Sequence, residues 1–458
     1  MTSMTLLPGS PVFPTGQDHY RLWQGLDSGS LAVTLAELAR DAGHLLLVIT
    51  PDSSSAQQLH DSLTFYLADS DTPVLLFPDW ETLPYDLFSP HQDIISERVQ
   101  VLHRLPDSHQ GVLIAPVSTV MQRLAPRVQI SGNSFLLKVG ERFDMDATRA
   151  RLAACGYRQR DSVFDHGEFA VRGAIMDIFP MGADQPFRIE LFDDDIESLR
   201  LFDPETQRSV DQVQDITLLP AAEYPLSADG ITRFRNRFRE RFDVDHRQCS
   251  LYQDVSEGIA SPGLEYYLPL FFEQMASLFD YLPGDVRLVE LAGCEQAAAH
   301  FWDEVSARHE DRRHDIRRPI LAPAELFLPI NELNQHLRQH PRARQLPAGD
   351  SPDSKAVAFD FRAPPVVTDR QSNPFSQLAA LPDEHPGLRL LVCAETPGRR
   401  EALLELMQKQ GIQPEIIDGW ADWRQGHATW SLTVGELDKG FWAPQANALV
   451  IAESQLYG

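Results

Sequence analysis

Hydrophobic positions in the first 120 residues follow two alternating patterns. Apolar residues with helical spacing cover 31–42, 54–67 and 92–105, and short continuous apolar runs cover 45–50, 74–77 and 112–116. A short apolar run between turn signals is typical of a buried strand, and strands joined through helices pair in parallel. The first part of the chain is therefore predicted to be a doubly wound α/β domain.

A different pattern, alternation of apolar with small or polar residues, occupies the stretch from Phe164 to Asp203. Two alternating segments flank PMGADQP, whose Pro and Gly are loop formers, so the stretch is predicted to be a β-hairpin. Residues at i, i+2 and i+4 of a strand share one face. One face is therefore expected to point to the core, with Asp177 as its exception. The apolar residues assigned to that face are Val171, Ile175, Phe179, Phe187, Ile189 and Leu191.

The opposite face of the predicted hairpin carries Arg172, Arg188, Glu190 and Phe192. Arginine and aromatic side chains dominate the binding energy of protein interfaces. We therefore interpret this face as a binding surface. The alternative is a solvated strand face with one incidental phenylalanine, because single exposed apolar residues are common on soluble proteins.

Two segments resemble a known family. The pattern FxxRGxxxDIFP, followed by RIELFDDDIESLRLFD, is similar to the second domain of the transcription-repair coupling factor (Mfd) family, a domain shared with UvrB. The segment DWETLPYDLFSPHQDIISERVQVLHRL, residues 79–105, resembles the coupling factors more closely than UvrB. The resemblance implies that the hairpin domain is the docking surface for UvrA.

The residues carried over from this resemblance lie on the face opposite the predicted core. Arg172, Arg188 and Phe192 are the expected hot spots, with the arginines pairing with acidic groups of UvrA and the phenylalanine filling a shallow pocket between them. Glu168 and Glu190 are expected at the rim of the contact. No catalytic residue and no metal-binding residue is predicted.

UvrB and related helicases place a phosphate-binding loop at the start of this fold, and the resemblance allows a direct test. Gly25 and Gly29 are present, but Ser30 and Leu31 stand where the lysine and the hydroxyl residue of such a loop would be. A phosphate loop needs that lysine to reach the terminal phosphates. The first lysine of the whole sequence is Lys138. A degenerate, non-functional nucleotide site is predicted.

The second half of that site is degenerate by the same comparison. The segment FDYLPGDVRLVELAG, residues 279–293, resembles the run into the Walker B strand, and the acidic pair falls on Leu291 and Ala292. Glu290 is a lone acid one residue earlier, and such an acid is expected to be solvated. No cofactor is therefore expected, with ATP and magnesium used only by the translocase of a longer parent protein. The alternative is an ATP-dependent DNA helicase-type enzyme that acts through this UvrB-like fold.

Three further clusters admit a binding or a packing interpretation, and packing is favoured for each. Aromatics can stack on bases or contact partners, yet helical spacing and proline-punctuated loops are more typical of packing on the same domain. The clusters are the segment 233–242 with phenylalanine at every fourth position, the loop residues Trp80, Tyr85 and Phe88, and Trp420, Trp423, Trp430 and Trp442.

The domain organisation follows from these patterns and from the distribution of Pro, Ser and Asp. A helicase-like parallel-sheet domain (the first domain) is interrupted by a small α+β hairpin domain and followed by a linker and a second small α/β domain (the last domain). The boundaries are 1–128 and 221–340 for the first domain, 129–220 for the hairpin domain, 341–374 for the linker and 375–458 for the last domain.

Composition limits the binding classes. The formal charge of −26 disfavours sequence-independent DNA binding, because phosphate contacts need clustered cations. Neither an apolar run long enough for a membrane span nor an export signal is found, so no membrane contact is expected. The four cysteines are far apart and form no CxxC pair, which predicts unpaired thiols in a reducing cytoplasm.

The resemblance covers essentially all 458 residues but only the N-terminal part of the coupling factors. It implies a fragment: a non-catalytic module that recruits UvrA to stalled RNA polymerase for transcription-coupled nucleotide excision repair. RNA polymerase and DNA are expected to be contacted beyond Gly458, through an ATP-dependent translocase of the parent. A C-terminal domain of the parent is expected to mask the UvrA-docking face.

Overall fold

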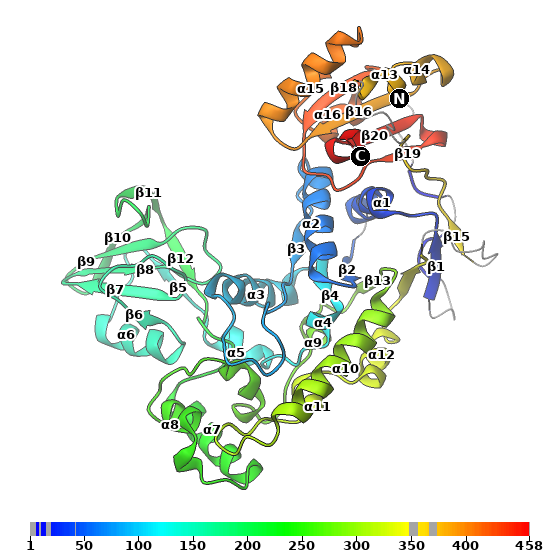
Figure 1. Ribbon diagram of the computed structural model, residues 1–458. Helices are drawn as coiled ribbons and strands as arrows, with labels where there is room; N and C mark the ends of the chain where they lie inside the picture. The colour runs from blue at the N-terminus through cyan, green and yellow to red at the C-terminus, as the bar shows by residue number, and fades with distance from the viewer. Residues whose placement is uncertain are drawn as a thin grey trace.

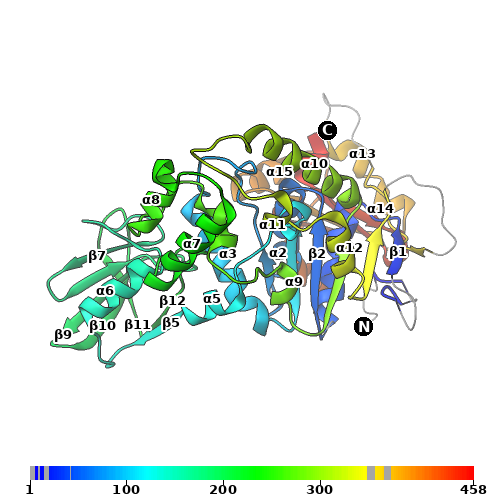
Figure 2. The ribbon, with the colours of Figure 1, turned by 90° about the horizontal axis from the view of Figure 1, so that it is seen from below.

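The computed structural model describes residues 6–8, 11–14, 20–41, 43–347, 356–365 and 373–457. The molecule has three sheet-containing parts: the first domain, the hairpin domain and the last domain. The hairpin domain projects from one end of the first domain, away from both termini, and the last domain packs against its helices α1 (Ser28–Asp41) and α2 (Ser53–Leu67) (Figures 1 and 2).

The first domain is built on a sheet of seven parallel strands in the order β15-β1-β14-β13-β2-β4-β3, which confirms the predicted parallel α/β class. Its central strands β2 and β4 are buried along their whole length, as expected for a sheet covered on both faces. The strands are β1 (Tyr20–Gln24), β2 (Leu45–Thr50), β3 (Val74–Leu76), β4 (Gly111–Pro116), β13 (Val286–Glu290), β14 (Arg342–Gln345) and β15 (Val357–Ala358).

Three strands of this sheet, β1, β14 and β15, are not among the predicted strand segments. β14 lies between β1 and β13, so residues 342–345 belong to the first domain and not to the predicted linker. The sequences of β1 (YRLWQ) and β14 (RARQ) contain arginines, so they do not form the continuous apolar run that predicts a buried strand. The sheet accommodates Arg342 by pairing its guanidinium with Glu290 at 2.9 Å and placing it over the Tyr20 ring. The remainder of the predicted linker is described only in part, because 348–355 and 366–372 lie outside the described residues.

The helices of the first domain match the predicted segments closely. α3 (Gln92–Arg104) follows a loop after β3, and α7 (Ala228–Arg241) begins after the chain returns from the hairpin domain. Phe234 and Phe238 of α7 are buried, which confirms packing for the segment 233–242. The other helices are α4 (Val117–Val120), α5 (Arg127–Gly132), α8 (Ser250–Ser256), α9 (Leu278–Tyr281), α10 (Cys294–Arg312), α11 (Pro323–Leu326) and α12 (Ile330–Leu337).

The aromatic loop between β3 and α3 divides into packed and exposed residues. Trp80 and Tyr85 are buried against Tyr266, which confirms packing for these two. Phe88 of the same loop is 69% exposed, so the packing prediction is wrong for this residue. A proline-punctuated loop therefore buried two of its aromatics and left the third in solvent.

The hairpin domain is inserted between α5 and α7, as predicted. Its main sheet has the order β11-β10-β9-β8-β7-β6, and a two-stranded sheet pairs β12 with β5. All neighbours in the main sheet are antiparallel except β6 and β7. The elements are β5 (Phe135–Lys138), α6 (Met145–Ala154), β6 (Arg158–Gln159), β7 (Glu168–Arg172), β8 (Ile175–Ile178), β9 (Phe187–Phe192), β10 (Asp195–Phe202), β11 (Ser209–Val213) and β12 (Asp215–Leu218).

The predicted core face of the hairpin is wrong along β8. Met176 and Ile178 are buried in the core, whereas Ile175 and Asp177 lie on the opposite face. The cause is the tight turn after β7: Arg172 pairs directly with Ile175, so these two residues share a face and the alternation starts afresh after the turn. Counting alternate residues through the turn places every β8 side chain on the wrong side.

A buried ion pair lies where the chain returns from the hairpin domain to the first domain. Arg98 of α3 donates from Nε to Glu223 at 2.8 Å and from Nη1 to the Pro78 carbonyl, and both charged side chains are almost fully buried. The Arg98 guanidinium also lies over the Phe77 ring. Removing one member of a buried pair typically costs about 3–5 kcal/mol, because the remaining charge is left without a partner.

A second buried acid lies close to this junction. Glu265 sits in the 3-10 segment Leu264–Leu270, and the Ser89 hydroxyl donates to its carboxylate at 2.9 Å. Burial raises the pKa of Glu265 to about 7, and the nearby Glu223 carboxylate adds to the effect. About half of this carboxyl group therefore stays protonated, close to the Arg98 pair, at neutral pH.

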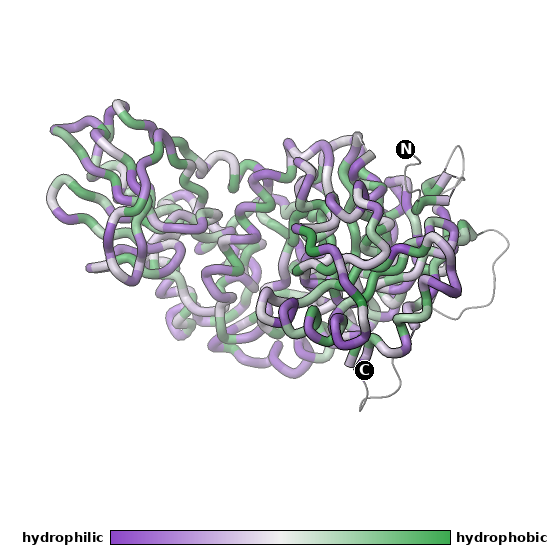
Figure 3. Tube along the Cα trace, turned by 90° about the horizontal axis from the view of Figure 1, so that it is seen from above, coloured by the Kyte–Doolittle hydropathy of each residue, from purple (hydrophilic) through white to green (hydrophobic). Residues whose placement is uncertain are grey.

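The last domain is a five-stranded sheet in the order β17-β18-β16-β20-β19, parallel except for the β19–β20 pair. In Figure 3, hydrophobic segments gather inside the part of the molecule that holds both termini. The elements are α13 (Phe375–Leu378), α14 (Leu381–Glu384), β16 (Arg389–Ala394), α15 (Pro397–Lys409), β17 (Glu415–Ile416), α16 (Trp420–Gln425), β18 (Trp430–Val434), β19 (Phe441–Ala443), β20 (Ala448–Ala452) and α17 (Glu453–Tyr457).

The last domain shares one hydrophobic core with the first. Trp420 and Trp423 are buried and in contact with each other, and the Trp420 ring meets Tyr66 of α2 edge-on with 4.9 Å between centroids. Trp430 is buried on the other face of the same sheet, among the residues under α15. Packing is therefore confirmed for these tryptophans, and two of them form a joint between domains.

Candidate docking surface and degenerate nucleotide site

Strand register arranges the polar face of the hairpin sheet in three rows, and we call this surface the docking face. The first row runs across the strands through Asp177, Arg188, Arg200 and Gln212. The second contains Arg172, Ile175, Glu190 and Ser198, and the third contains Phe192 opposite Asp195. The predicted residues Arg172, Arg188, Glu190 and Phe192 therefore do share one face.

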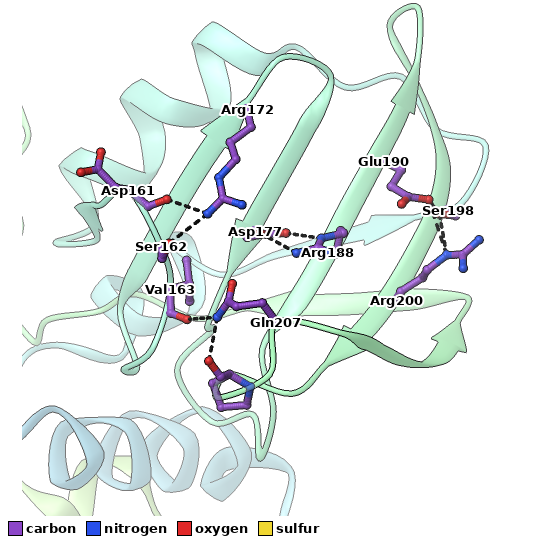
Figure 4. A network of polar contacts seen from close by, with 11 residues as sticks. Asp161, Ser162, Val163, Arg172, Asp177, Arg188, Glu190, Ser198, Arg200 and Gln207 are labelled. Atoms are coloured by element: carbon purple, nitrogen blue, oxygen red, sulfur yellow. Dashed lines mark hydrogen bonds and ion pairs between the residues drawn. The ribbon is translucent and has the colours of Figure 1, made fainter.

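Arg188 is held from two sides. Its Nε and Nη2 atoms donate to the two carboxylate oxygens of Asp177 at 2.7 and 3.0 Å, and its guanidinium lies over the Phe202 ring at 5.1 Å (Figure 4). Asp177 is only 3% exposed. The hydrogen bonds that Arg188 donates to Asp177 raise the pKa of Arg188, although partial burial opposes this. Arg188 is thus a fixed cation whose charge is balanced inside the protein.

Arg172 is fixed in a different way. Its Nη2 atom donates to the Asp161 carbonyl at 2.7 Å and to the Ser162 hydroxyl at 3.0 Å, in the loop that precedes β7 (Figure 4). Both acceptors are neutral, so the charge of Arg172 has no carboxylate partner among the described residues. This exposed arginine can therefore offer a full positive charge to a partner.

Glu168, the first residue of β7, stabilises the same loop. Its carboxylate accepts the backbone N–H groups of Phe164 and Asp165 and the Nε–H of Arg160. Burial alone would raise the pKa of Glu168, but these three donors outweigh it and lower the pKa. A largely buried carboxylate with three internal donors positions the loop, and its predicted place at the rim of a contact stays a prediction.

The second arginine of the first row, Arg200, is paired with Glu190. The Ser198 hydroxyl donates to Glu190 at 2.5 Å, and Arg200 lies 3.5 Å from the same carboxylate (Figure 4). Arg188 and Arg200 oppose each other directly across β9 and β10, an arrangement that is unfavourable for like charges. Asp177 and Glu190 balance the two cations, one acid to each.

Phe192 stands at the outer edge of the docking face with 68% of its surface exposed. It occupies the third row, beyond Arg172 and Arg188 and not between them. The partner's pocket for Phe192 would therefore lie to one side of the groups that contact the arginines. Sequence reasoning missed Asp177, Ser198 and Arg200 as members of this face. The alternation of β10 could have indicated the last two, whereas Asp177 was assigned to the core because of the turn.

The segment predicted to be a degenerate nucleotide site lies where β1 leads into α1. The Asp27 carboxylate caps the helix by accepting the backbone N–H of Ser30 at 2.9 Å and its hydroxyl at 2.6 Å. The Ser28 hydroxyl donates to Asp438 of the last domain at 3.0 Å. Two carboxylates therefore occupy the helix end that would bind phosphate in an active site. Leu31, the other predicted residue of this loop, is buried beneath them.

Both glycines of this loop serve close packing. A Cβ atom on Gly25, whose φ is +87°, would lie 2.4 Å from the Phe359 carbonyl oxygen. A Cβ atom on Gly29 would lie 2.3 Å from the Gly440 carbonyl oxygen of the last domain. Glycine at these positions is required by backbone contacts within the protein.

The far side of the site is bridged by one side chain. Gln345 donates to the Leu26 carbonyl after β1 at 3.0 Å and accepts the N–H of Ala292 after β13 at 3.2 Å. A small pocket of about 160 Å³ remains nearby, lined in part by Leu291, Ala292 and Asp438. The amide of Gln345 thus spans the gap in which phosphates and metal would lie.

Glu290, expected to be solvated, is instead paired with Arg342 at 2.9 Å and is mostly buried, with 12% of its side chain exposed. Burial raises the pKa of Glu290, and the positive charges of Arg342 and Arg344 reduce this rise. Across the described ranges, no group of three or more His, Cys, Asp or Glu residues is arranged to hold a metal ion. The four cysteines are buried and unpaired.

Comparison with known proteins assigns the chain. Residues 135–224 match the family described as the UvrB interaction domain, and residues 383–456 match the MFD D3 domain. The transcription-repair-coupling factors of Escherichia coli K12 and Haemophilus influenzae are 40% and 38% identical over 455 and 452 residues, or 98% of this chain. The chain belongs to the transcription-repair-coupling factor family. It corresponds to the N-terminal region of these proteins.

The coupling factors are much longer than this chain, which spans 39% of the length of the Escherichia coli and Haemophilus relatives. A third coupling factor, from Bacillus subtilis, is 29% identical over 304 residues, covering 63% of this chain and 25% of the relative. Among the described residues, the coupling-factor chain contains no helix that is both long and apolar enough to cross a membrane.

Proposed function

We propose that this chain is a non-catalytic recruitment module whose docking face binds UvrA during transcription-coupled nucleotide excision repair. The proposal rests chiefly on the display of an exposed Phe192 on the same sheet face as an unbalanced Arg172, in a domain that matches the UvrB interaction domain. Exposed aromatic and arginine residues on a rigid sheet are well suited to bind a protein partner, because little side-chain freedom is lost on binding.

Each residue has a definite part in this contact. Phe192 enters an apolar recess of the partner, and Arg172 meets a carboxylate there. Arg188 offers its remaining N–H groups from a fixed position, because Asp177 already balances its charge. Glu168 acts through the loop that holds Arg172, and Glu190 acts through Arg200.

Calorimetric titration of the intact chain with purified UvrA tests the proposal. Replacing Phe192 by alanine removes an aromatic side chain that is 68% exposed before binding. Burying a whole phenylalanine is worth about 1.5–3 kcal/mol, so the loss on binding should be about 1–2 kcal/mol, or roughly 5- to 30-fold in affinity. Arg172→Gln should weaken binding mainly at low salt, because a rim charge is screened by ions.

The controls are matched in exposure and chemistry. Phe88→Ala removes an aromatic that is 69% exposed but lies in the first domain, and Arg317→Gln removes an exposed arginine there. Neither should change binding to UvrA. If Phe88→Ala weakens binding as much as Phe192→Ala, the docking face is not the site of contact. Absence of binding by the unmutated chain refutes the proposal.

We further infer that this segment does not hydrolyse ATP. The carboxylates of Asp27 and Asp438, the bridging amide of Gln345 and the absence of a lysine before Lys138 all support this inference. No observation favours the alternative of a helicase-type enzyme acting through this fold. Nucleotide and magnesium would serve only the ATP-dependent translocase of the complete parent.

The complete parent is proposed to contact RNA polymerase and DNA outside this chain and to displace the polymerase. A further domain of the parent is proposed to cover the docking face until UvrA is needed. In that case this chain should bind UvrA more readily than the intact parent does. The net charge of −26 supports DNA contact outside this segment. The unpaired cysteines support a cytoplasmic location.

A further inference from the structure

Asp177 is the most deeply buried charge beneath the docking face. It is 3% exposed, lies on the same face as Arg188 and accepts two hydrogen bonds from it. A buried carboxylate requires a partner, because an isolated charge in a protein interior is strongly destabilising. The pair is therefore obligatory for both residues, and it fixes the plane of the guanidinium.

Phe202 completes the support of Arg188. Its ring is fully buried in a small cluster with Val163, Ala170 and Phe179, and the guanidinium lies over it. Two of the three guanidinium nitrogens are occupied by Asp177, and no hydrogen bond from Nη1 is found among the described residues. The side chain is thus locked with one nitrogen left to donate to a partner.

Resting on the UvrA-docking function proposed above, we propose that Asp177 is a positioning residue for that contact. Asp177 holds the Arg188 guanidinium in place and balances its charge before binding, so that Arg188 contributes to the lifetime of the complex. Arg172 instead supplies the unbalanced charge that accelerates association. The partner surface that fits this arrangement has a carboxylate facing Arg172, a neutral carbonyl facing Arg188 and an apolar recess for Phe192.

The division of labour follows from general behaviour at interfaces. Rim charges change the association rate and its salt dependence, whereas members of buried hydrogen-bonded pairs change the dissociation rate. Side chains that are already fixed lose less freedom on binding. Releasing Arg188 from Asp177 should therefore shorten the lifetime of the complex without slowing its formation.

The test is a double-mutant cycle measured by surface plasmon resonance with UvrA as the probe. Asp177→Asn and Arg188→Gln should each raise the dissociation rate about 5- to 20-fold, in the range of a lost charge-assisted hydrogen bond. The two changes together should do no more than Arg188→Gln alone. Arg172→Gln should instead lower the association rate and flatten its dependence on salt.

A second measurement does not depend on UvrA. The Nε–H resonance of Arg188, assigned by its loss in Arg188→Gln, should exchange slowly with solvent in the parent chain and rapidly in Asp177→Asn. Rapid exchange in the unmutated chain would show that Asp177 does not hold Arg188 in place, whether or not UvrA binds. If the unmutated chain does not bind UvrA, the proposed function fails, while this measurement still decides whether Asp177 fixes Arg188.

The kinetic outcomes also separate the alternatives. An unchanged dissociation rate in Asp177→Asn overturns the positioning role. The positioning role is also overturned if Asp177→Asn raises the dissociation rate by the same factor in the Arg188→Gln variant as in the unmutated chain. A general weakening of the fold would act in both backgrounds. Circular dichroism melting of each variant shows whether folding has changed, and the Asp177→Asn, Arg188→Gln pair removes the buried charge together with its partner.

Discussion

Replacing Glu265 by glutamine should stabilise the protein at pH 8 relative to its effect at pH 4.5. The side chain is fully enclosed, and burial raises its pKa from the ordinary 4.5 to about 7. A pKa raised in the folded state means that the folded protein holds a proton that the unfolded chain has released. The stability from this group is therefore fully present below pH 4.5 and is lost as the pH rises through 7.

The magnitude follows from the size of that pKa change. At about 1.4 kcal/mol for each pKa unit, the stability lost between pH 4.5 and the region above pH 7 is about 3 kcal/mol. Glutamine keeps the shape of the side chain and an oxygen for the Ser89 hydroxyl, but it carries no charge at any pH. Above pH 7 the variant avoids the buried negative charge that the parent must accept.

Urea unfolding at pH 4.5 and at pH 8, followed by circular dichroism, measures the effect. The advantage of Glu265→Gln over the unmutated chain should be about 3 kcal/mol larger at pH 8 than at pH 4.5. Glu257→Gln, a change of an exposed carboxylate in the same region, should show no such difference. The reasoning is refuted if the advantage of Glu265→Gln is equal at the two pH values.

Two further predictions concern the segment predicted to be a degenerate nucleotide site. Gly29→Ala should destabilise the joint with the last domain by about 1–3 kcal/mol, because its Cβ would lie 2.3 Å from the Gly440 carbonyl oxygen. Chemical unfolding monitored by tryptophan fluorescence checks this against Gly43→Ala, where nothing lies within 4 Å, and equal stability of the two variants would contradict it. ATP with magnesium should not raise the melting temperature, because Asp27, Asp438 and Gln345 occupy the phosphate region. A ligand at 100 times its dissociation constant adds about 2.7 kcal/mol of stability, so a saturable shift in a thermal melt would show that the site still works.

The parallel sheet and its helices could be predicted because their hydrophobic patterns are long and regular. β2 and β4 are continuous apolar runs, and α2 and α3 keep helical spacing over three turns or more. β14 could not be predicted in this way. Its arginines are tolerated in the sheet only because Glu290 and Tyr20, both distant in sequence, lie beside Arg342.

The docking face shows a similar limit. The residue types Arg172, Arg188 and Phe192 could be selected from one strand alternation and from the family resemblance. The state of each arginine could not, because it depends on cross-strand neighbours. A single turn at Gly173 decides whether Asp177 lies under Arg188 or in the core, and alternation alone does not reveal where the count restarts.

The exposed Phe88 illustrates a third limit. Trp80, Tyr85 and Phe88 belong to one loop, and composition gives no reason to separate them. The packing of Tyr85 depends on the Leu321 carbonyl, which accepts its hydroxyl at 3.0 Å, and on Tyr266 beside it. Both partners are more than 180 residues away in sequence, so only the folded chain distinguishes the buried rings from the exposed one.

The start of α1 carries contacts that hold the molecule together. Ser30 completes the helix cap, Gly29 lets the last domain approach closely, and Gln345 joins two strand ends. A lysine at position 30 would replace the buried hydroxyl that completes this cap. A substitution that introduces one feature of a phosphate loop here would therefore also remove a contact on which the arrangement of the domains depends.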